Sequence, residues 1–287
     1  MNEDSIKIAR DYMDSLVVES RIVGAARPSS KVTLCGIEFD TPIMTAALSH
    51  IDLVGMAQGA ARLNAPVSIG MGDNDELMRV LGTGAHVMKI IKPYKDKDEI
   101  LKRIECARDN GAMAVGMDVE HAVNADDDED SIVVGKAMKL PTLEELREYV
   151  ELAKIPFFIK GAMSPHDVRR AAEIGCEGVI LSHHNGLMRC SVPPVMMLGE
   201  IREDIGDDFT VIVDGGMESG YDAFKALALG ASLVTVGKRL IEPLKNEGAD
   251  GVYNVLRNMT GELRAMMLRT DSADLGSIDP GVIHRLK

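Results

Sequence analysis

Short apolar runs rich in β-branched residues recur along the chain from Pro42 onward, and each is followed by a turn and a longer amphipathic segment. A parallel strand is buried on both faces and is apolar throughout, whereas a helix that covers a sheet is apolar along one side only. The pattern therefore predicts eight βα units, with strands at residues 43–48, 67–71, 86–91, 112–118, 157–162, 178–184, 210–215 and 233–237.

Eight such units predict an α/β protein with a (β/α)8 TIM barrel, because eight parallel strands joined by right-handed crossovers close into a cylinder. The competing arrangement is an open doubly wound sheet, but no G-x-G-x-x-G sequence follows the first predicted strand. Helix signals agree with the barrel. Ser164-Pro165 and a capping box from Thr142 to Glu145 mark helix starts, and helix ends are expected near Gly175, Gly206 and Gly230. A last amphipathic helix is expected over residues 248–268.

Residues 1–41 precede the barrel of residues 42–287, and we expect them to pack on it rather than to form a domain of their own. A helix is predicted over residues 4–18. Two alternating segments, 32–34 and 37–39, flank Cys35-Gly36 and predict a small hairpin. Such a hairpin cannot bury its own core, so we expect it to plug one end of the barrel.

Charge and composition narrow the class of protein. The formal net charge of −13 over 287 residues argues against a nucleic-acid or anionic-membrane surface, although one local phosphate site stays compatible with it. The four cysteines lack C-x-x-C spacing, and no apolar run is long enough for a secretion signal or a membrane span, so we expect a cytoplasmic protein. The acidic run 124–130 is interpreted as a solvated loop, and no metal site is predicted.

Polar side chains at the ends of the predicted strands are the candidates for chemistry, because active sites of this fold lie at the C-terminal rim of the barrel. His183 and His184 follow one strand and either transfer protons or only satisfy local hydrogen bonds. Lys160 ends the strand F-F-I-K. A buried ammonium needs a negative partner, which is either an anion developing on a cofactor or substrate, or a carboxylate such as Asp118.

Glycines follow the seventh and eighth predicted strands, in Asp214-Gly215-Gly216 and Gly237-Lys238. Backbone N–H groups of glycines can approach an anion closely, and the loops after these two strands are the usual phosphate site of such barrels. The alternative is that the glycines only make tight turns. We favour a phosphate-bearing ligand.

Five segments carry a more specific signature: IKG at 159–161, ILSHHNG at 180–186, VDGG at 213–216, KALALGA at 225–231 and VGK at 236–238. Their order, spacing and residue types resemble the FMN-dependent α-hydroxy-acid dehydrogenase family, which includes glycolate oxidase and lactate oxidase. The resemblance runs from about Pro42 to the C-terminus and is strongest after Pro156. It implies bound FMN, hydride transfer to flavin N5, and a homo-oligomer, since family members are often tetramers.

The resemblance also implies roles for individual residues. His184 corresponds to the family's proton-accepting histidine, Asp118 to the aspartate that pairs with it, and Lys160 to the lysine at the flavin N1/O2 edge. The residues expected to contact FMN are Thr45, Ala46, Ala47, Gly70, Lys160, Ser182, Asp214, Gly215, Gly216, Gly237 and Lys238.

The chain departs from the family pattern where the substrate carboxylate would be held. Where the family has N-H-G-x-R, the nearest arginine here is Arg189, two positions late, and Lys92 stands near the family's tyrosine after the third strand. Lys92, His184 and Arg189 are therefore the expected substrate contacts. Glu218 replaces an arginine that would touch the FMN phosphate.

We therefore expect an FMN-dependent oxidoreductase that acts on a hydroxy-acid-like small molecule, not necessarily an ordinary 2-hydroxy acid. Two alternatives stay open at this point. One is a redox-neutral flavin isomerase similar to type 2 isopentenyl diphosphate isomerase. The other is a non-catalytic barrel that binds FMN or another phosphate ligand.

Overall fold

The computed structural model describes residues 5–123, 135–184, 187–188 and 190–286. Eight parallel strands form one sheet in the order β4-β11-β10-β9-β8-β7-β6-β5. Their bounds are β4 Ile43–Thr45, β5 Val67–Ile69, β6 Val87–Ile91, β7 Ala114–Asp118, β8 Phe157–Lys160, β9 Gly178–Leu181, β10 Thr210–Asp214 and β11 Leu233–Val236. The end strands β4 and β5 meet through a bridge between Leu48 and Ile69, which closes the sheet into a barrel.

The predicted TIM barrel is confirmed, and all eight predicted strands are present. Each observed strand is shorter than its prediction by one to three residues, mostly at its C-terminal end. At several of those ends the chain leaves the ladder while its sequence stays apolar or small, as at Gly161-Ala162. After β9 the backbone itself turns away: His184 has a φ of 46°, which is incompatible with an extended strand.

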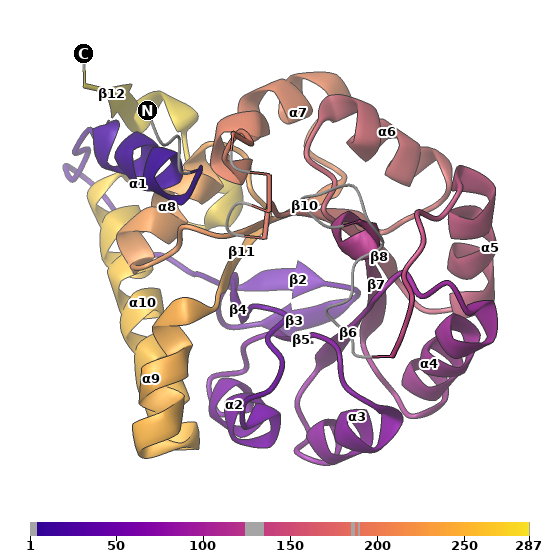
Figure 1. Ribbon diagram of the computed structural model, residues 1–287. Helices are drawn as coiled ribbons and strands as arrows, with labels where there is room; N and C mark the ends of the chain where they lie inside the picture. The colour runs from indigo at the N-terminus through magenta and orange to yellow at the C-terminus, as the bar shows by residue number, and fades with distance from the viewer. Residues whose placement is uncertain (1–4, 124–134, 185–186, 189, 287) are drawn as a thin grey trace.

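Helices surround the barrel as an outer ring (Figure 1). They are α2 Leu53–Ala61, α3 Asn74–Leu81, α4 Lys97–Asp109, α5 Leu143–Ala153, α6 Pro165–Glu173, α7 Leu198–Ile205, α8 Gly220–Ala228, α9 Lys238–Glu247 and α10 Ala249–Arg269. The predicted caps are present: Ser164 accepts a hydrogen bond from the N–H of Asp167, and Thr142 forms a capping box with Glu145. The single helix predicted over 248–268 is preceded by α9, and Gly248 separates the two helices.

The interior of the barrel is filled at one end by the N-terminal hairpin. Strands β2 (Val32–Leu34) and β3 (Ile37–Phe39) pair in antiparallel fashion, and Leu34 and Phe39 are buried in a cluster with barrel side chains. The barrel side chains of that cluster are Met44, Met88, Ile90, Ala114, Phe158, Ile180, Ile212 and Leu233. The hairpin therefore plugs this end of the barrel, as its size suggested, and leaves the other end for a ligand.

The N-terminal helix is shorter than predicted. Helix α1 covers Ser5–Ser15, and Leu16–Val18 instead form strand β1, which pairs with β12 (Ile283–Arg285) near the C-terminus. This pairing joins two ends of the chain that lie side by side in Figure 1. A partner more than 260 residues away leaves no local signal in residues 16–18, so the helix prediction was wrong there.

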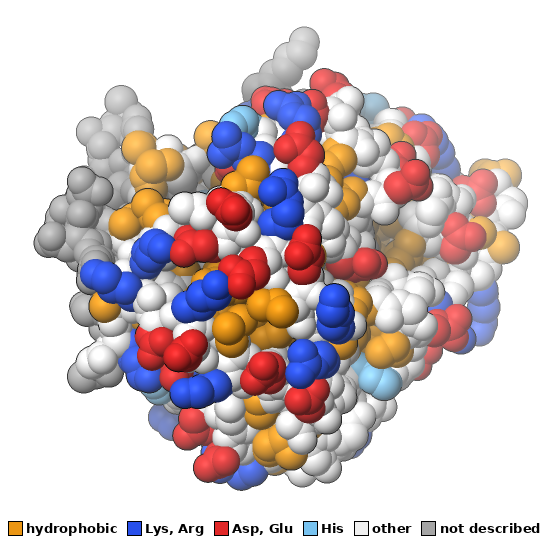
Figure 2. All heavy atoms as spheres, turned by 90° about the vertical axis from the view of Figure 1, so that its right-hand side faces the viewer, with side chains coloured by type: hydrophobic (Ala, Val, Ile, Leu, Met, Phe, Trp, Pro, Cys, Tyr) orange, Lys and Arg blue, Asp and Glu red, His pale blue; other side chains and the backbone are white. Residues whose placement is uncertain are grey.

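The outer surface carries charges of both signs. Figure 2 shows Lys and Arg side chains interspersed with Asp and Glu on the face that lies at the right of Figure 1. One such pair of opposite charges joins Lys97 of α4 to Glu148 of α5. Among the described residues on this face, such intermixed charge offers no continuous basic stripe for a phosphate backbone. In the part of the chain that the structure describes, no helix combines the length and hydropathy needed to cross a membrane.

Candidate active site

The candidate site follows from the two-residue period of the strands. Interior-facing positions are apolar near the hairpin, as at Ile90, Phe158, Ile180, Ile212 and Leu233. The next interior-facing position on each strand, two residues on, lies at the C-terminal rim. Polar side chains occupy that position on six neighbouring strands: Lys92, Asp118, Lys160, Ser182, Asp214 and Thr235.

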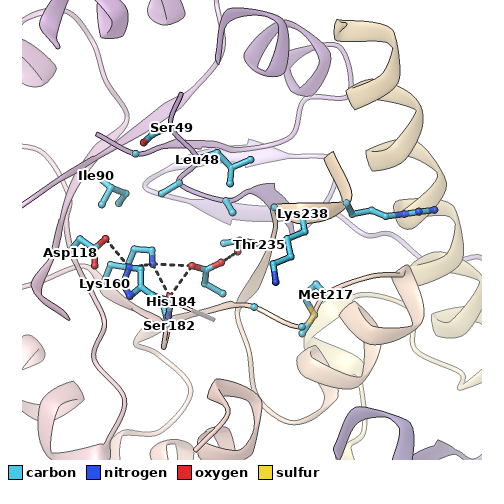
Figure 3. A pocket seen from close by; sticks show the side chains of 18 of the residues that line it. Leu48, Ser49, Ile90, Asp118, Lys160, Ser182, His184, Met217, Thr235 and Lys238 are labelled. Atoms are coloured by element: carbon cyan, nitrogen blue, oxygen red, sulfur yellow. Dashed lines mark hydrogen bonds and ion pairs between the residues drawn. The ribbon is translucent and has the colours of Figure 1, made fainter. Parts of the chain in front are cut away.

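These side chains line a cavity of about 1060 Å³ that opens at the rim of the barrel. Figure 3 shows Asp118, Lys160, Ser182 and His184 gathered on one side of it, with Thr235, Met217 and Lys238 on the other. The cavity also reaches Ala46, Ala47, Gly70, Gly215, Gly216 and Gly237. The structure therefore brings most of the residues expected from the sequence to one concave surface.

Lys160 is fixed by an ion pair on the cavity floor. Its Nζ lies 3.0 Å from Oδ2 of Asp214 and donates a hydrogen bond to Oγ of Ser182 at 2.7 Å. Burial lowers the pKa of Lys160, but the negative charges of Asp214 and Asp118 more than offset this and raise it. The lysine is therefore a fixed cation, and its ion-pair partner is Asp214 rather than the Asp118 considered from the sequence.

His184 lies beside this cation. Its Nε2 is 2.9 Å from Oδ2 of Asp118 and 3.0 Å from Nζ of Lys160. Lys92 donates to the same Asp118 oxygen at 2.9 Å. Burial favours a protonated Asp118, but Lys160, His184 and Lys92 together lower the pKa of that carboxyl, so Asp118 is ionised.

Two residues that the sequence did not single out complete the surroundings of His184. Glu120 and His121 lie in the 3-10 turn Val119–Ala122 that follows β7. Oε2 of Glu120 contacts Nδ1 of His184, and the His121 ring packs edge-on against the His184 ring, with centroids 4.2 Å apart. The acidic and imidazole side chains directly after Asp118 were the available signal, but nothing local shows that the turn folds back toward β9.

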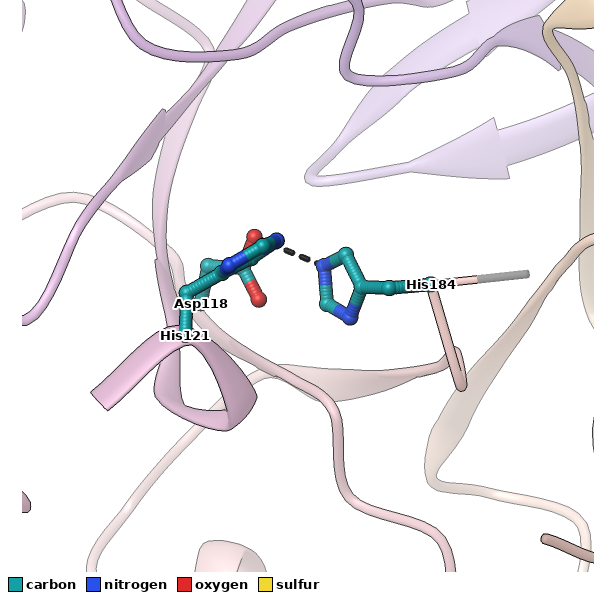
Figure 4. A group of neighbouring side chains, drawn as sticks. All are labelled: Asp118, His121 and His184. Carbon is teal, nitrogen blue, oxygen red and sulfur yellow. Dashed lines mark hydrogen bonds and ion pairs between the residues drawn. The ribbon is translucent and has the colours of Figure 1, made fainter. Parts of the chain in front are cut away.

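The donor set Asp118, His121 and His184 is of a kind that binds metal ions, and its ligand atoms lie within 4.8 Å of one another (Figure 4). However, Nζ of Lys92 lies 2.9 Å from Oδ2 of Asp118, and Nζ of Lys160 lies 3.0 Å from Nε2 of His184. Both ammonium groups would repel a cation at this point. The arrangement is better suited to holding protons than to holding a metal.

The opposite end of the cavity is suited to an anion. Gly215 and Gly216 have φ values of 112° and 77°, and a Cβ at either position would meet nothing within 4 Å, so their backbone borders open space. Helix α9 begins there, after Gly237, and no side chain caps its N-terminus, whereas Ser219 caps the neighbouring α8. The uncapped N–H groups and the exposed Lys238 form a binding site of the kind that phosphates occupy.

Some expected site residues lie elsewhere or are not described. Thr45 does not line the cavity; its hydroxyl donates to the Ser68 carbonyl, because odd-numbered positions of β4 face outward. His183 is buried, and neither of its ring nitrogens has a hydrogen-bond partner in the described part of the chain. Burial lowers the pKa of His183, which keeps it neutral. Arg189 and the acidic run 124–130 lie outside the described residues.

The sequence of the chain matches a family of known proteins, and this match indicates the ligand of the cavity. The FMN-dependent dehydrogenase family matches residues 121–285, more than half of the chain. The chain belongs to this family. The resemblance inferred from the five sequence segments is thereby confirmed, and FMN is the cofactor that membership implies.

Curated members of the family match part of the chain. An L-lactate oxidase from Alicycliphilus denitrificans is 36% identical over 151 residues, which is 52% of this chain and 41% of the relative. A 4-hydroxymandelate oxidase from Amycolatopsis orientalis is 39% identical over 127 residues, 44% of this chain and 35% of the relative. The matched segment thus spans about two fifths of the length of these relatives.

Solved structures of the family share the fold over the whole chain. A lactate oxidase from Pediococcus acidilactici superposes with a TM-score of 0.91 at 20% identity and covers 100% of this chain and 88% of its own. A mandelate oxidase with bound (S)-mandelic acid gives 0.89 at 23% identity, with 100% and 90% covered. At this level of identity the likeness concerns the barrel and not the substrate.

The residues present fit FMN. The glycine-bordered space and the uncapped start of α9 would take the phosphate, and Lys160 and Ser182 line the same cavity and would face the rest of the cofactor. Lys160 is a fixed positive charge in the same cavity. Glu218 is an exposed carboxylate on the phosphate side of the cavity and is the residue that fits least well.

Proposed function

We propose that the protein catalyses FMN-dependent oxidation of a hydroxy-acid-like small molecule. The observation that carries the proposal is that His184 Nε2 lies within 3.0 Å of both Asp118 Oδ2 and Lys160 Nζ, in the same cavity as the anion site. A proton acceptor and a fixed cation are the two groups that oxidation next to a hydroxyl needs from the protein.

The roles divide between the protein and the cofactor. His184 accepts the proton of the substrate hydroxyl at Nε2, and Asp118 and Lys160 hold that nitrogen in place. FMN, when bound, supplies the acceptor for the hydrogen that leaves the α-carbon with its electron pair. Lys160 stabilises negative charge, since Asp214 and Ser182 fix its ammonium rigidly in the cavity floor.

Lys92 is the proposed anchor for the acidic end of the substrate. It lines the cavity, is 6% exposed, and is held by Asp118 next to His184. A lysine binds a carboxylate as a point charge, without the bidentate geometry of an arginine. We therefore expect looser selection among substrates at this end than an arginine clamp would give, with Arg189 as a second candidate contact.

The test is anaerobic bleaching of the flavin. The purified protein, loaded with FMN, is mixed without oxygen with glycolate, L-lactate or (S)-mandelate, and the flavin absorbance is followed. Bleaching by one of them, lost in His184→Ala while FMN stays bound, supports the proposal. Substrate turnover without bleaching would favour the isomerase, and a yellow protein inert to a broad panel of hydroxy acids would favour the non-catalytic barrel.

The assembly and compartment expected from the sequence stay proposals as well. We expect a homo-oligomer, which light scattering of the FMN-loaded protein would measure. All four cysteines are free thiols, which is compatible with the reducing cytoplasm expected from their spacing.

A further inference from the structure

The two nitrogens of the His184 ring have different surroundings. Nδ1 contacts Oε2 of Glu120, and no other hydrogen-bond partner of Nδ1 is found in the described part of the chain. Nε2 lies between an acceptor, Oδ2 of Asp118 at 2.9 Å, and a donor, Nζ of Lys160 at 3.0 Å. A carboxylate can only accept, so Nδ1 keeps its proton, whereas Nε2 has a partner both with and without one.

This arrangement separates the tasks of the two carboxylates. A histidine that serves as base needs one nitrogen fixed by a partner and the other free to exchange a proton. Glu120 contacts the fixed nitrogen. Asp118 contacts the exchanging nitrogen and also binds Lys92, so it lies on the reacting side of the ring.

The backbone holds Glu120 in this position. Gly161 follows Lys160 at the end of β8, has a φ of 99°, and packs directly against the turn that carries Glu120. A Cβ at Gly161 would lie 3.0 Å from Cβ of Glu120 and 3.2 Å from its backbone nitrogen. The backbone of Glu120 therefore packs against the residue that follows β8.

Charge around the ring points the same way. Among the residues that the structure describes, the charged and titratable groups around His184 are Lys92, Asp118, Glu120, His121, Lys160, His183 and Asp214. Among these residues, each of the ion pairs Lys92–Asp118 and Lys160–Asp214 contains one positive and one negative charge, so Glu120 is the remaining carboxylate beside the ring. It faces Nδ1, where the N–H of a neutral His184 ring can donate to it.

We propose that Glu120 is the positioning residue of His184, fixing the proton on Nδ1 so that Nε2 is the atom that accepts the substrate proton. Asp118 then orients Nε2 and Lys92 instead of fixing the tautomer. The inference rests on the proposed function for its kinetic consequence, but the proton position itself can be measured without any substrate.

The first experiment is nuclear magnetic resonance of the FMN-loaded protein labelled with ¹⁵N-histidine. His184→Ala identifies the His184 signals, and a pH titration follows both nitrogens. We expect Nδ1 to stay protonated throughout and Nε2 to titrate, and we expect Glu120→Ala to remove the preference for Nδ1–H. Glu105→Gln, on the exposed side of α4, is the matched control and should change nothing.

The second experiment is the pH profile of anaerobic flavin reduction by the best of the three hydroxy acids tested above. Glu120→Gln keeps a hydrogen-bond acceptor but removes the charge that favours a protonated His184. The acid limb of the profile, where the rate rises with pH as His184 loses its proton, should therefore shift to lower pH. The plateau rate at high pH should fall. Glu120→Asp should restore part of the plateau. A role confined to folding would lower the rate without moving the limb.

Two results would overturn the inference. One is a His184 ring that carries its proton on Nε2 in the FMN-loaded protein. The other is a tautomer and titration that Glu120→Ala leaves unchanged. Either would be recorded without substrate, so failure of the inference is distinguishable from failure of the proposed function, which would appear as normal histidine signals with no flavin bleaching.

Discussion

The ammonium of Lys160 lies 3.0 Å from Oδ2 of Asp214, and the lysine side chain is only 4% exposed. Removing one partner of such a pair leaves a buried charge without its counter-ion, which costs about 3–5 kcal/mol. We therefore expect Lys160→Met to lower the free energy of unfolding by roughly that amount and to slow flavin reduction by about 10²-fold or more.

A double substitution separates these two effects. Lys160→Met combined with Asp214→Asn removes both charges, so urea unfolding should return most of the lost stability while flavin reduction stays slow. Recovery of the rate in the double variant would show that the ion pair matters for folding and that the cation does not matter for chemistry.

A second prediction concerns the pH dependence set by His184. Burial lowers the pKa of His184, but the hydrogen bonds to Asp118 and Glu120 outweigh burial, so the pKa is raised above its ordinary value. The ring accepts a proton only when neutral, so the rate of flavin reduction should rise as the pH rises through this raised pKa.

The contribution of His184 to folding stability should fall as the pH rises, whereas the rate of flavin reduction should increase. A raised pKa means that the folded protein binds the proton more tightly, so the stabilisation is complete below the unfolded pKa, about 6.5, and is lost as the pH rises through the folded pKa. The difference in unfolding free energy between the native protein and His184→Ala should therefore shrink with rising pH. A difference that grows would contradict the raised pKa.

A third prediction concerns Glu218. This exposed carboxylate lies on the phosphate side of the cavity and repels an anion there. We expect Glu218→Gln to tighten FMN binding by up to about fivefold, which corresponds to about 1 kcal/mol for an exposed charge. Flavin fluorescence titration measures this, and the gain should diminish as salt is added. Glu203→Gln, an exposed carboxylate on α7 outside the cavity lining, should leave FMN affinity unchanged.

A fourth prediction concerns the hairpin plug. Phe39 is fully buried against the barrel interior, so Phe39→Ala should cost about 3–5 kcal/mol in unfolding free energy. The hairpin closes the end opposite the cavity, so flavin reduction at a temperature where the variant stays folded should be unchanged. Glu38→Ala, on the exposed side of the same strand, is the control.

The strands and the ring of helices could be predicted because their signals are local. Buried parallel strands read as unbroken apolar runs, and caps such as Thr142 mark helix starts. The predicted strand ends indicated which residues lie at the rim, and the five family segments indicated their roles. What could not be predicted depends on contacts between distant segments: strand β1 with β12, Lys160 with Asp214, and Glu120 with His184.

Thr45 shows a further limit of prediction from the sequence, namely the face of a strand on which a side chain lies. Its place at the end of the first predicted strand put it among the residues expected to contact FMN, but the pleat of β4 turns its side chain outward to Ser68. A shift of one residue in a strand reverses the face on which a side chain lies. Ala46, the next residue, lines the cavity instead.

The last prediction uses Gly161 to displace Glu120 without changing its charge. A Cβ at this position would crowd the Glu120 backbone, and a φ of 99° disfavours any residue other than glycine. Gly161→Ala should therefore cost about 1–2 kcal/mol and should move the carboxylate away from Nδ1 of His184. The acid limb of flavin reduction should then shift toward lower pH, as in Glu120→Gln, with FMN still bound. Gly175→Ala also replaces a glycine of positive φ, but just after the C-terminal end of α6, where a Cβ would meet only Val150 at 3.7 Å. That control should lose stability and keep the pH profile of the native protein, so a shifted profile in both variants would assign the effect to general loosening of the fold rather than to Glu120.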